Sequence, residues 1–314
     1  MILVGSANAF RAFTEGRTAL LAGEPALDVV EAVIREVEDD PDDHTVGYGG
    51  FPNILGEVEL DASLMEGATR RAGAVAGLRG FRHPISIARE VMDQLPHVLL
   101  VGDGAARFAD ECEAERIDLL TSHAEHVWRQ GIEQLDGGEG ALAGPLAEHV
   151  SRLVLDPEHV TGVLEPEPRT GTVNVLARDA KGDIASGAST SGWAWKYPGR
   201  AGDTGAIGAG NYCDNRYGAA ACTGWGELAV RAAGAYSVVA GLRFGLTLAD
   251  ACAEYLRDLP DPGVGTRTVP LHVVALDANG QHIAASTRPS AMYAYWDASL
   301  AEPELRRRTH ILRD

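Results

Sequence analysis

Cysteine is scarce in this chain, and the few cysteines stand far apart. The four are Cys112, Cys213, Cys222 and Cys252, and no two of them form a Cys-x-x-Cys pair. This scattered pattern does not suggest a disulfide framework, so we expect no disulfides. Such cysteine usage is typical of a reducing compartment, and we predict a cytoplasmic location.

The chain also lacks an excess of positive charge and any long apolar run. It carries 27 Lys and Arg residues against 45 Asp and Glu residues, a formal net charge of −18 at pH 7. Nucleic acids and anionic membranes attract basic surfaces, so we expect neither as a partner. No apolar run approaches the roughly 20 residues that span a bilayer. Residues 1–4 are too short an apolar stretch for a signal peptide.

Apolar residues and glycine are plentiful, at 45% of the composition and 37 of the 314 residues. This length and composition suffice for one large domain or two small ones with a buried core. Apolar periodicity predicts helices that begin near Pro25, Pro84, Thr223 and Thr247. Predicted strands lie at 2–4, 58–64, 97–101, 271–276 and 283–287.

Residues 169–191 are the stretch around which the chain is organised, and they read as a β-hairpin. Apolar side chains alternate over 173–177, and a polar turn followed by a run of small residues completes the hairpin. A similar hairpin is predicted at 271–287. Two like hairpins with helices before and between them suit a helix–sheet–sheet–helix sandwich.

Thr172 stands at the head of the first hairpin, after an acidic, Pro-rich segment at about 155–171 that we predict to be a mobile linker. Threonine at a strand start is ordinary when taken alone. A threonine with a free α-amino group, however, carries nucleophile and base in one residue. That amine exists only if the Gly171–Thr172 bond is cut. We therefore predict self-cleavage, in which the Thr172 hydroxyl attacks the Gly171 carbonyl and water resolves the resulting ester.

Three other motifs resemble a phosphate-binding loop, a dinucleotide-binding fold and a zinc site, but each lacks residues that such a site requires. The Gly-rich segment 45–50 lacks the Lys-Ser/Thr ending of a phosphate-binding loop, and is more typical of a turn that brings two backbones together. After the strand at 97–101, Arg107 stands where a dinucleotide fold has its third glycine. His123 and His126 lie one helical turn apart, but zinc would need further ligands. We expect no metal and no cofactor.

Several motifs, in order, carry a family resemblance. They are Thr-Val-Gly-Tyr-Gly-Gly (45–50), Gly-Glu-Val-Glu-Leu-Asp-Ala-Ser-Leu-Met-Glu-Gly (56–67), Gly-Arg-Ala-Gly-Asp-Thr (199–204), Gly-Ala-Gly (208–210) and Cys-Thr-Gly-Trp-Gly-Glu (222–227). With them the chain resembles the asparaginase-2 family of N-terminal-nucleophile (Ntn) hydrolases, over most of its length. That family holds glycosylasparaginases, plant-type asparaginases and isoaspartyl peptidases. The motifs at 45–67 resemble the glycosylasparaginase branch in particular.

This resemblance implies an α+β fold, the four-layer αββα sandwich of Ntn hydrolases, as one domain over residues 1–314. It also implies self-cleavage into an α chain, 1–171, and a β chain, 172–314. Assembly as an (αβ)2 homo-oligomer would follow. The implied partner is a small molecule, a β-aspartyl amide.

The resemblance further implies a role for each matching residue. Thr172 would attack the substrate amide, and the Thr223 hydroxyl with the Gly224 N–H would stabilise the oxyanion. Thr190 matches the second Thr of the family's Ser-Thr-x-Gly motif and would hydrogen-bond the Thr172 hydroxyl. The substrate's two charged groups are assigned to Arg200, which would bind the α-carboxylate, and Asp203, which would bind the α-ammonium. Ordinary turn chemistry and a surface ion pair are the structural alternatives for these residues.

The chain departs from the glycosylasparaginase pattern in three places. Gly171 precedes the nucleophile where that branch has Asp, Ser191 replaces an Asn or Gly, and Gly5-Ser6-Ala7-Asn8 replaces a segment containing Asn-Thr-Trp. Without the Trp we expect a permissive leaving-group pocket. Glycosyl-asparagine, L-asparagine and isoaspartyl dipeptides are therefore alternative substrates. An unprocessed amino-acid-binding protein without turnover is an alternative of another class.

Overall fold

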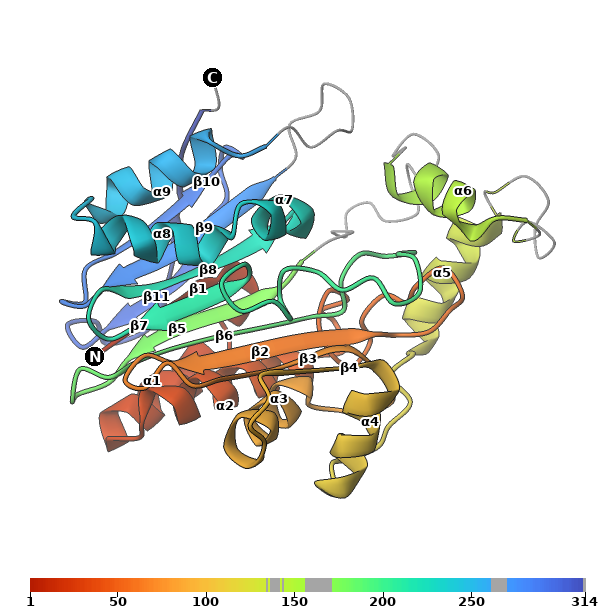
Figure 1. Ribbon diagram of the computed structural model, residues 1–314, viewed down its shortest axis with the longest axis horizontal. Coiled ribbons are helices and arrows are strands. Elements are labelled where there is room, and N and C mark those ends of the chain that lie inside the picture. Colours follow the sequence, from red (N-terminus) through yellow and green to blue (C-terminus); the bar gives the residue numbers. More distant parts are fainter. Residues whose placement is uncertain (134, 136–141, 143, 156–170, 261–269, 313–314) are drawn as a thin grey trace.

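The computed structural model describes residues 1–133, 135, 142, 144–155, 171–260 and 270–312 of the chain. Two β-sheets lie face to face, and helices cover the outer face of each, as Figure 1 shows. The four-layer αββα sandwich is therefore confirmed. The predicted linker at about 155–171 lies almost wholly outside the described residues.

The larger sheet has eight strands in the order β12-β11-β1-β5-β6-β2-β3-β4. Their bounds are β1 Ile2–Ser6, β2 Leu60–Glu66, β3 Ala72–Leu78, β4 Leu99–Val101, β5 Val173–Arg178, β6 Ile184–Thr190, β11 Met292–Asp297 and β12 Glu304–Arg307. The β5–β6 hairpin, predicted from the sequence, lies between β1 and β2, and pairs with both in antiparallel register. Segments from both sides of Gly171 thus alternate within one sheet.

The smaller sheet has five strands in the order β13-β10-β9-β8-β7. Their bounds are β7 Asn211–Asp214, β8 Gly218–Gly224, β9 Leu271–Asp277, β10 His282–Ser286 and β13 Thr309–His310. The β9–β10 hairpin is the second one predicted from the sequence. Between the sheets, side chains such as Val4, Leu176 and Val274 form one apolar core.

Helices on each side bury an apolar face against the adjacent sheet. Beside the larger sheet lie α1 Phe13–Ala22, α2 Ala26–Glu38, α3 Pro84–Gln94 and α4 Gly102–Glu111; beside the smaller lie α7 Gly226–Arg231, α8 Gly234–Arg243 and α9 Leu248–Arg257. The predicted starts at Pro25 and Thr247 hold: Pro25 is the N-cap of α2, and the Thr247 hydroxyl accepts from the Asp250 N–H. Among the described residues, none of the helices has the length and apolarity needed to cross a bilayer.

Shorter helical elements lie at the edges of the sandwich. They are the 3₁₀ turn Ala7–Ala9, α5 Ser122–Glu133, α6 Leu146–Val150 and the π-helical turn Ser151–Leu155. In Figure 1, α5 and α6 project from one end of the molecule. A separate apolar cluster that includes Phe51, Val127 and Trp195 anchors α5 to the rest of the fold.

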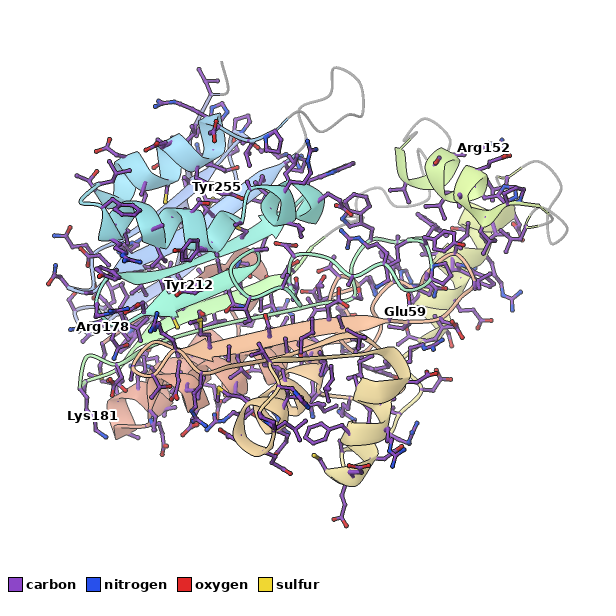
Figure 2. The ribbon with its side chains drawn as sticks, in the orientation of Figure 1. Glu59, Arg152, Arg178, Lys181, Tyr212 and Tyr255 are labelled. Carbon is purple, nitrogen blue, oxygen red and sulfur yellow. The ribbon has the colours of Figure 1, made fainter. Side chains whose placement is uncertain are left out.

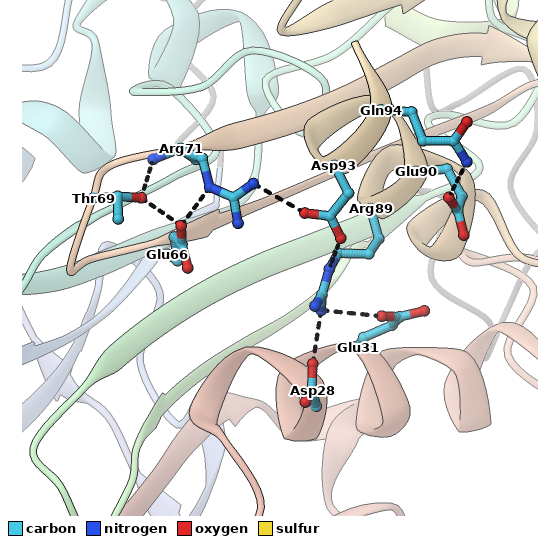
Figure 3. Close-up of polar contacts among 9 residues, drawn as sticks. All are labelled: Asp28, Glu31, Glu66, Thr69, Arg71, Arg89, Glu90, Asp93 and Gln94. Atoms are coloured by element: carbon cyan, nitrogen blue, oxygen red, sulfur yellow. Dashed lines mark hydrogen bonds and ion pairs between the residues drawn. The ribbon is translucent and has the colours of Figure 1, made fainter. Parts of the chain in front are cut away.

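A surface ion network braces α2, α3 and the β2–β3 hairpin (Figure 3). Arg89 Nη1 lies 2.8 Å from Asp28 Oδ1, and Arg89 Nε lies 2.7 Å from Asp93 Oδ2. Arg71 joins the other oxygen of Asp93, at 3.2 Å, to Glu66, at 2.7 Å. Exposed pairs of this kind contribute under about 1 kcal/mol each, so the network orients helices that apolar packing already holds.

One prediction made from the sequence is wrong, and it concerns the segment that follows β7. Thr223 and Gly224 were expected to open a helix, but they end strand β8, and the helical pattern that follows is split into α7 and α8. Ala233 lies between these helices in the left-handed region, with a φ of 46°. Strand β8 escaped prediction because Ala and Cys fill it, so its two faces show no contrast of polarity.

Candidate active site

Thr172 lies immediately before β5, in the middle of the larger sheet. Thr172 is 8% exposed, and β1 and β6 pair with β5 on either side. Val173 and Val175 pack toward the helices, whereas Leu176 packs into the core between the sheets. Because both faces of β5 are buried, the position of Thr172 at its head is firmly determined.

Two hydroxyl groups converge on the carbonyl oxygen of Gly171. Thr172 Oγ1 donates to this oxygen at 2.7 Å, and Thr190 Oγ1, from the end of β6, donates to it at 2.6 Å. The Gly192 N–H in turn donates to Thr190 Oγ1 at 2.9 Å, which orients the Thr190 hydroxyl. Hydrogen bonds to a carbonyl oxygen polarise the group and favour nucleophilic attack on its carbon.

Gly171 has no room for a side chain. A Cβ placed there would lie 2.5 Å from Thr45 Oγ1 and 2.6 Å from Thr45 Cβ. Thr45 is itself fixed, because its hydroxyl donates to Asp43 Oδ1 at 2.6 Å. The other oxygen of Asp43 accepts from Asn8 Nδ2 at 2.7 Å. A polar chain from the N-terminal segment therefore holds the Thr45 side chain against Gly171, at the peptide bond that we predict to be cleaved.

The Gly-rich segment 45–50 makes the close backbone approach that its composition predicted. A Cβ on Gly47 would lie 2.2 Å from the Glu38 carbonyl oxygen, and one on Gly50 would lie 2.5 Å from Ser191 Cβ. The Ser191 N–H donates to the Thr45 carbonyl at 2.8 Å. The segment thus fastens Thr45 to the end of β6, beside Thr190.

A cavity of about 790 Å³ opens beside Thr172. Thr223 and Gly224, at the end of β8, line it together with Gly171 and Thr172. The structure thus brings together four residues that the sequence assigned to one site. Its wall includes Ser6, Ala7, Asn8 and Phe10, so the segment that lacks the family's Trp does face this cavity. The volume falls within the usual range of small-molecule sites.

Arg200 and Asp203 do not line this cavity in the uncleaved chain. Arg200 instead binds Glu227, with Nε and Nη2 at 3.0 and 2.8 Å from Oε1, and its guanidinium lies over the Trp193 ring at 4.5 Å from the centroid. Only 16% of the Arg200 side chain is exposed. A substrate carboxylate would therefore have to share or displace the bond to Glu227, a partner that the sequence did not reveal.

Asp203 is buried beside Arg200 with one carboxylate oxygen unused. Among the residues that the structure describes, none forms a hydrogen bond with its Oδ2. Burial raises the pKa of Asp203 to about 7, and the nearby carboxylates of Glu227 and Asp61 add to the rise, while Arg200 opposes it. An incompletely satisfied buried carboxylate is costly, and a cationic ligand would compensate for it.

Buried polar residues hold the loop that carries Arg200 and Asp203. The Glu59 carboxylate, which Figure 2 labels, accepts from the Gly199 N–H at 3.0 and 3.1 Å. Asp61 Oδ2 accepts from the Gly202 N–H at 2.9 Å, and Lys196 Nζ donates to the Glu59 carbonyl at 2.9 Å. These bonds come from the motif at 56–67, in which Glu59 and Asp61 support the loop of Arg200 and Asp203, whereas Glu66 belongs to the surface ion network.

Two glycines connect this loop to the predicted catalytic residues. A Cβ on Gly192, next to the Thr190 hydroxyl, would lie 3.3 Å from Arg200 Nη1. A Cβ on Gly226, two residues beyond Gly224, would lie 2.5 Å from Asp203 Oδ1. Arg200 thus lies against Gly192, which is bonded to the Thr190 hydroxyl, and Asp203 lies against Gly226, close to Gly224.

Several residues around the site were not predicted from the sequence. They are Asp43 and Thr45 beside Gly171, Glu227 beside Arg200, and His272, Arg288 and Arg308 in the cavity wall. Only Thr45 and Glu227 lay inside motifs that the sequence singled out. In the described part of the chain, no three His, Cys, Asp or Glu side chains are grouped so as to hold a metal ion. The four cysteines are free.

Residues 5–303 match the family Asparaginase_2, described as "Asparaginase". The chain is 35% identical over 272 residues to an N(4)-(beta-N-acetylglucosaminyl)-L-asparaginase of Elizabethkingia miricola, covering 85% of this chain and 73% of the relative. It is 37% identical over 285 residues to an isoaspartyl peptidase of Salmonella typhimurium, with coverage of 90% and 83%. It is also 37% identical over 294 residues to a plant-type L-asparaginase of Pyrococcus abyssi, with coverage of 92% and 90%.

Proposed function

This chain belongs to the asparaginase-2 family of Ntn hydrolases, and we propose that it is a self-processing threonine amidohydrolase that cleaves the side-chain amide of asparagine derivatives. Its named relatives hydrolyse amide bonds, and the chain is a hydrolase of that class. One observation carries the proposal for this site: the hydroxyls of Thr172 and Thr190 both contact the Gly171 carbonyl oxygen.

Maturation begins with the attack of Thr172 Oγ1 on the Gly171 carbonyl carbon. The hydroxyl loses its proton as the new C–O bond forms, and negative charge develops on the carbonyl oxygen. Thr190 donates to that oxygen and stabilises the charge. The C–N bond to Thr172 then breaks, and the nitrogen takes up the proton that the hydroxyl released. Water hydrolyses the ester, which leaves a carboxylate on Gly171 and a free α-amine on Thr172.

In turnover, the neutral α-amine of Thr172 removes the proton of its own hydroxyl, which attacks the substrate amide carbon. Thr223 and Gly224 line the same cavity as Thr172, and they would stabilise the oxyanion through the hydroxyl and the backbone N–H. The leaving amine departs with a proton, and water resolves the aspartyl ester. Once the Gly171 carbonyl has moved away, the Thr190 hydroxyl becomes available to the Thr172 hydroxyl.

Arg200 and Asp203 would hold the two charged groups of the aspartyl moiety. Arg200 offers a planar guanidinium to the α-carboxylate, in competition with Glu227. The unused oxygen of Asp203 suits the α-ammonium. Glycosyl-asparagine, L-asparagine and isoaspartyl dipeptides share this moiety, so all three remain candidate substrates. We further propose an (αβ)2 assembly and a cytoplasmic location.

The substrate clamp is tested by Arg200→Lys. This change keeps the charge but loses the planar fork, so we expect KM to rise at least about tenfold, with little effect on cleavage at Gly171. Aspartate release from L-asparagine and from β-aspartyl dipeptides measures the effect. The matched control is Arg216→Lys in the pair with Asp214, whose contacts are 2.9 and 2.6 Å and which lies outside the cavity wall. An unchanged KM in Arg200→Lys would show that Arg200 has a structural role and does not bind the substrate carboxylate.

The raised pKa of Asp203 predicts a distinct pH dependence. Below about pH 7 the carboxyl becomes protonated and loses the charge that holds the substrate ammonium, so kcat/KM should fall. The α-amine of Thr172, with an ordinary pKa of about 7.7–8.0, must also be neutral. The acid limb of kcat/KM should therefore approach a slope of about two, and that of kcat about one, because bound substrate keeps Asp203 ionised. Equal slopes in the two profiles would contradict this role of Asp203.

A further inference from the structure

The cavity beside Thr172 has a basic wall that is separate from the Arg200–Asp203 loop. Arg288 follows β10, Arg308 lies between β12 and β13, and His272 is on β9. All three line the cavity together with Thr172. In a chain with a net charge of −18, two arginines and a histidine gathered next to the predicted nucleophile need an explanation.

Arg308 is a buried cation whose guanidinium bonds to backbone carbonyl oxygens. It is 8% exposed, and its Nε and Nη1 donate to the carbonyl oxygens of Met292 at 2.9 Å and Val273 at 3.0 Å. Across the described residues, no Asp or Glu pairs with its guanidinium. Burial lowers the pKa of Arg308 to about 10, so it remains charged at neutral pH. A buried cation without an anion is unfavourable, and an anionic ligand would compensate for it.

Arg288 and His272 are held together by one serine. Ser286 Oγ lies 2.7 Å from His272 Nδ1, accepts from the Arg288 N–H at 2.8 Å and donates to the Arg288 carbonyl at 2.9 Å. Burial lowers the pKa of His272 to about 3, and the charges of Arg308 and Arg288 contribute. The histidine is therefore neutral at physiological pH, and the positive charge of this wall belongs to the two arginines.

The cavity wall also has three acidic residues, of which Asp42 is exposed to solvent and Asp40 and Asp43 have partners of their own. Asp43 accepts hydrogen bonds from Thr45 and Asn8. Asp40 lies 3.7 Å from Arg11 and accepts from the Asp42 N–H. An anion in the cavity would thus be drawn to the wall of Arg288 and Arg308 rather than to the segment 40–43.

We propose that Arg288 and Arg308 form a leaving-group subsite for the carboxylate of the amino acid released from a β-aspartyl dipeptide. This inference rests on the proposed function, which places the scissile amide at Thr172. Ammonia, released from L-asparagine, and the uncharged sugar amine of glycosyl-asparagine carry no anion and would leave the subsite unused. The aspartyl carboxylate is assigned to Arg200, so the two carboxylates of a β-aspartyl dipeptide have separate partners.

A pair of substrates that differ only in this carboxylate tests the proposal. On fully processed protein, kcat/KM should be at least about tenfold higher for β-aspartyl-alanine than for β-aspartyl-alaninamide, or about 1.4 kcal/mol. Arg288→Gln should reduce this ratio severalfold, and Arg308→Met should reduce it further if that variant folds. The control is Arg307→Gln, an exposed residue of β12 outside the cavity wall, which should leave the ratio unchanged.

The outcomes separate the subsite from the enzyme activity. A ratio near one in the unaltered protein overturns the subsite while leaving the proposed function intact. An equal loss of preference in Arg288→Gln and Arg307→Gln also overturns it, because the effect would then come from net charge. If no β-aspartyl amide of any kind is hydrolysed, the proposed function fails and the subsite fails with it. The wild-type ratio and Arg288→Gln are decisive even where Arg308→Met does not fold.

Discussion

Purified protein should convert from one chain of 33.2 kDa into fragments of about 18 and about 15 kDa, in proportion to 171 and 143 of its 314 residues. Thr172→Ala removes the attacking hydroxyl, so this variant should stay whole and lose activity by at least a thousandfold, about 4 kcal/mol. Intact-mass measurement over a time course follows the conversion. Thr172→Ser keeps a hydroxyl and is the matched control, which should cleave.

The two fragments should remain associated until they are denatured. Strands β5 and β6 from the second fragment lie between β1 and β2 from the first, so separation would break antiparallel pairing along both sides of the hairpin. One gel-filtration peak that contains both masses is the expected result. A persistent 33.2 kDa chain that still hydrolyses substrate would contradict the role of Thr172. A persistent chain that binds amino acids without turnover would favour the binding-protein alternative.

Thr190→Val should slow self-cleavage by about 10²–10³ fold. The change keeps the size and branching of the side chain but removes the hydroxyl that donates to the Gly171 carbonyl at 2.6 Å. Loss of one donor to a developing oxyanion typically has an effect of this size. The fraction of intact chain, followed by electrophoresis from the moment of purification, gives the rate.

Two comparisons make the Thr190 result specific. Thr190→Ser retains the hydroxyl and should cleave within about tenfold of the unaltered protein. The valine variant should unfold at a lower temperature than uncleaved Thr172→Ala, because the buried Gly192 N–H loses its acceptor, at a cost of about 1–3 kcal/mol, but it should remain folded under the conditions of the cleavage assay. Cleavage of Thr190→Val at the normal rate would show that the Thr172 hydroxyl alone suffices to activate the carbonyl.

Strong local patterns led to correct predictions over much of the fold. The alternation at 173–177 gave the correct hairpin, and the Thr247–Asp250 cap gave the correct helix start. Strand β8 was missed because its alternating residues, such as Ala220 toward the helices and Ala221 toward the other sheet, are all small and apolar. The break at Ala233 was missed because alanine otherwise favours an uninterrupted helix.

The sequence by itself determined the position of Thr172 at a strand start, the glycine before it, and the motifs that carry Thr190, Arg200, Asp203 and Thr223. These are local features, since each depends on residues close together in the chain. Only the tertiary structure decided that the Thr190 hydroxyl donates to the Gly171 carbonyl and that Glu227 forms an ion pair with Arg200. It likewise brought Arg288 and Arg308 into the wall beside Thr172. Such contacts depend on strand register and on the packing of two sheets, and no periodicity within a single segment encodes them.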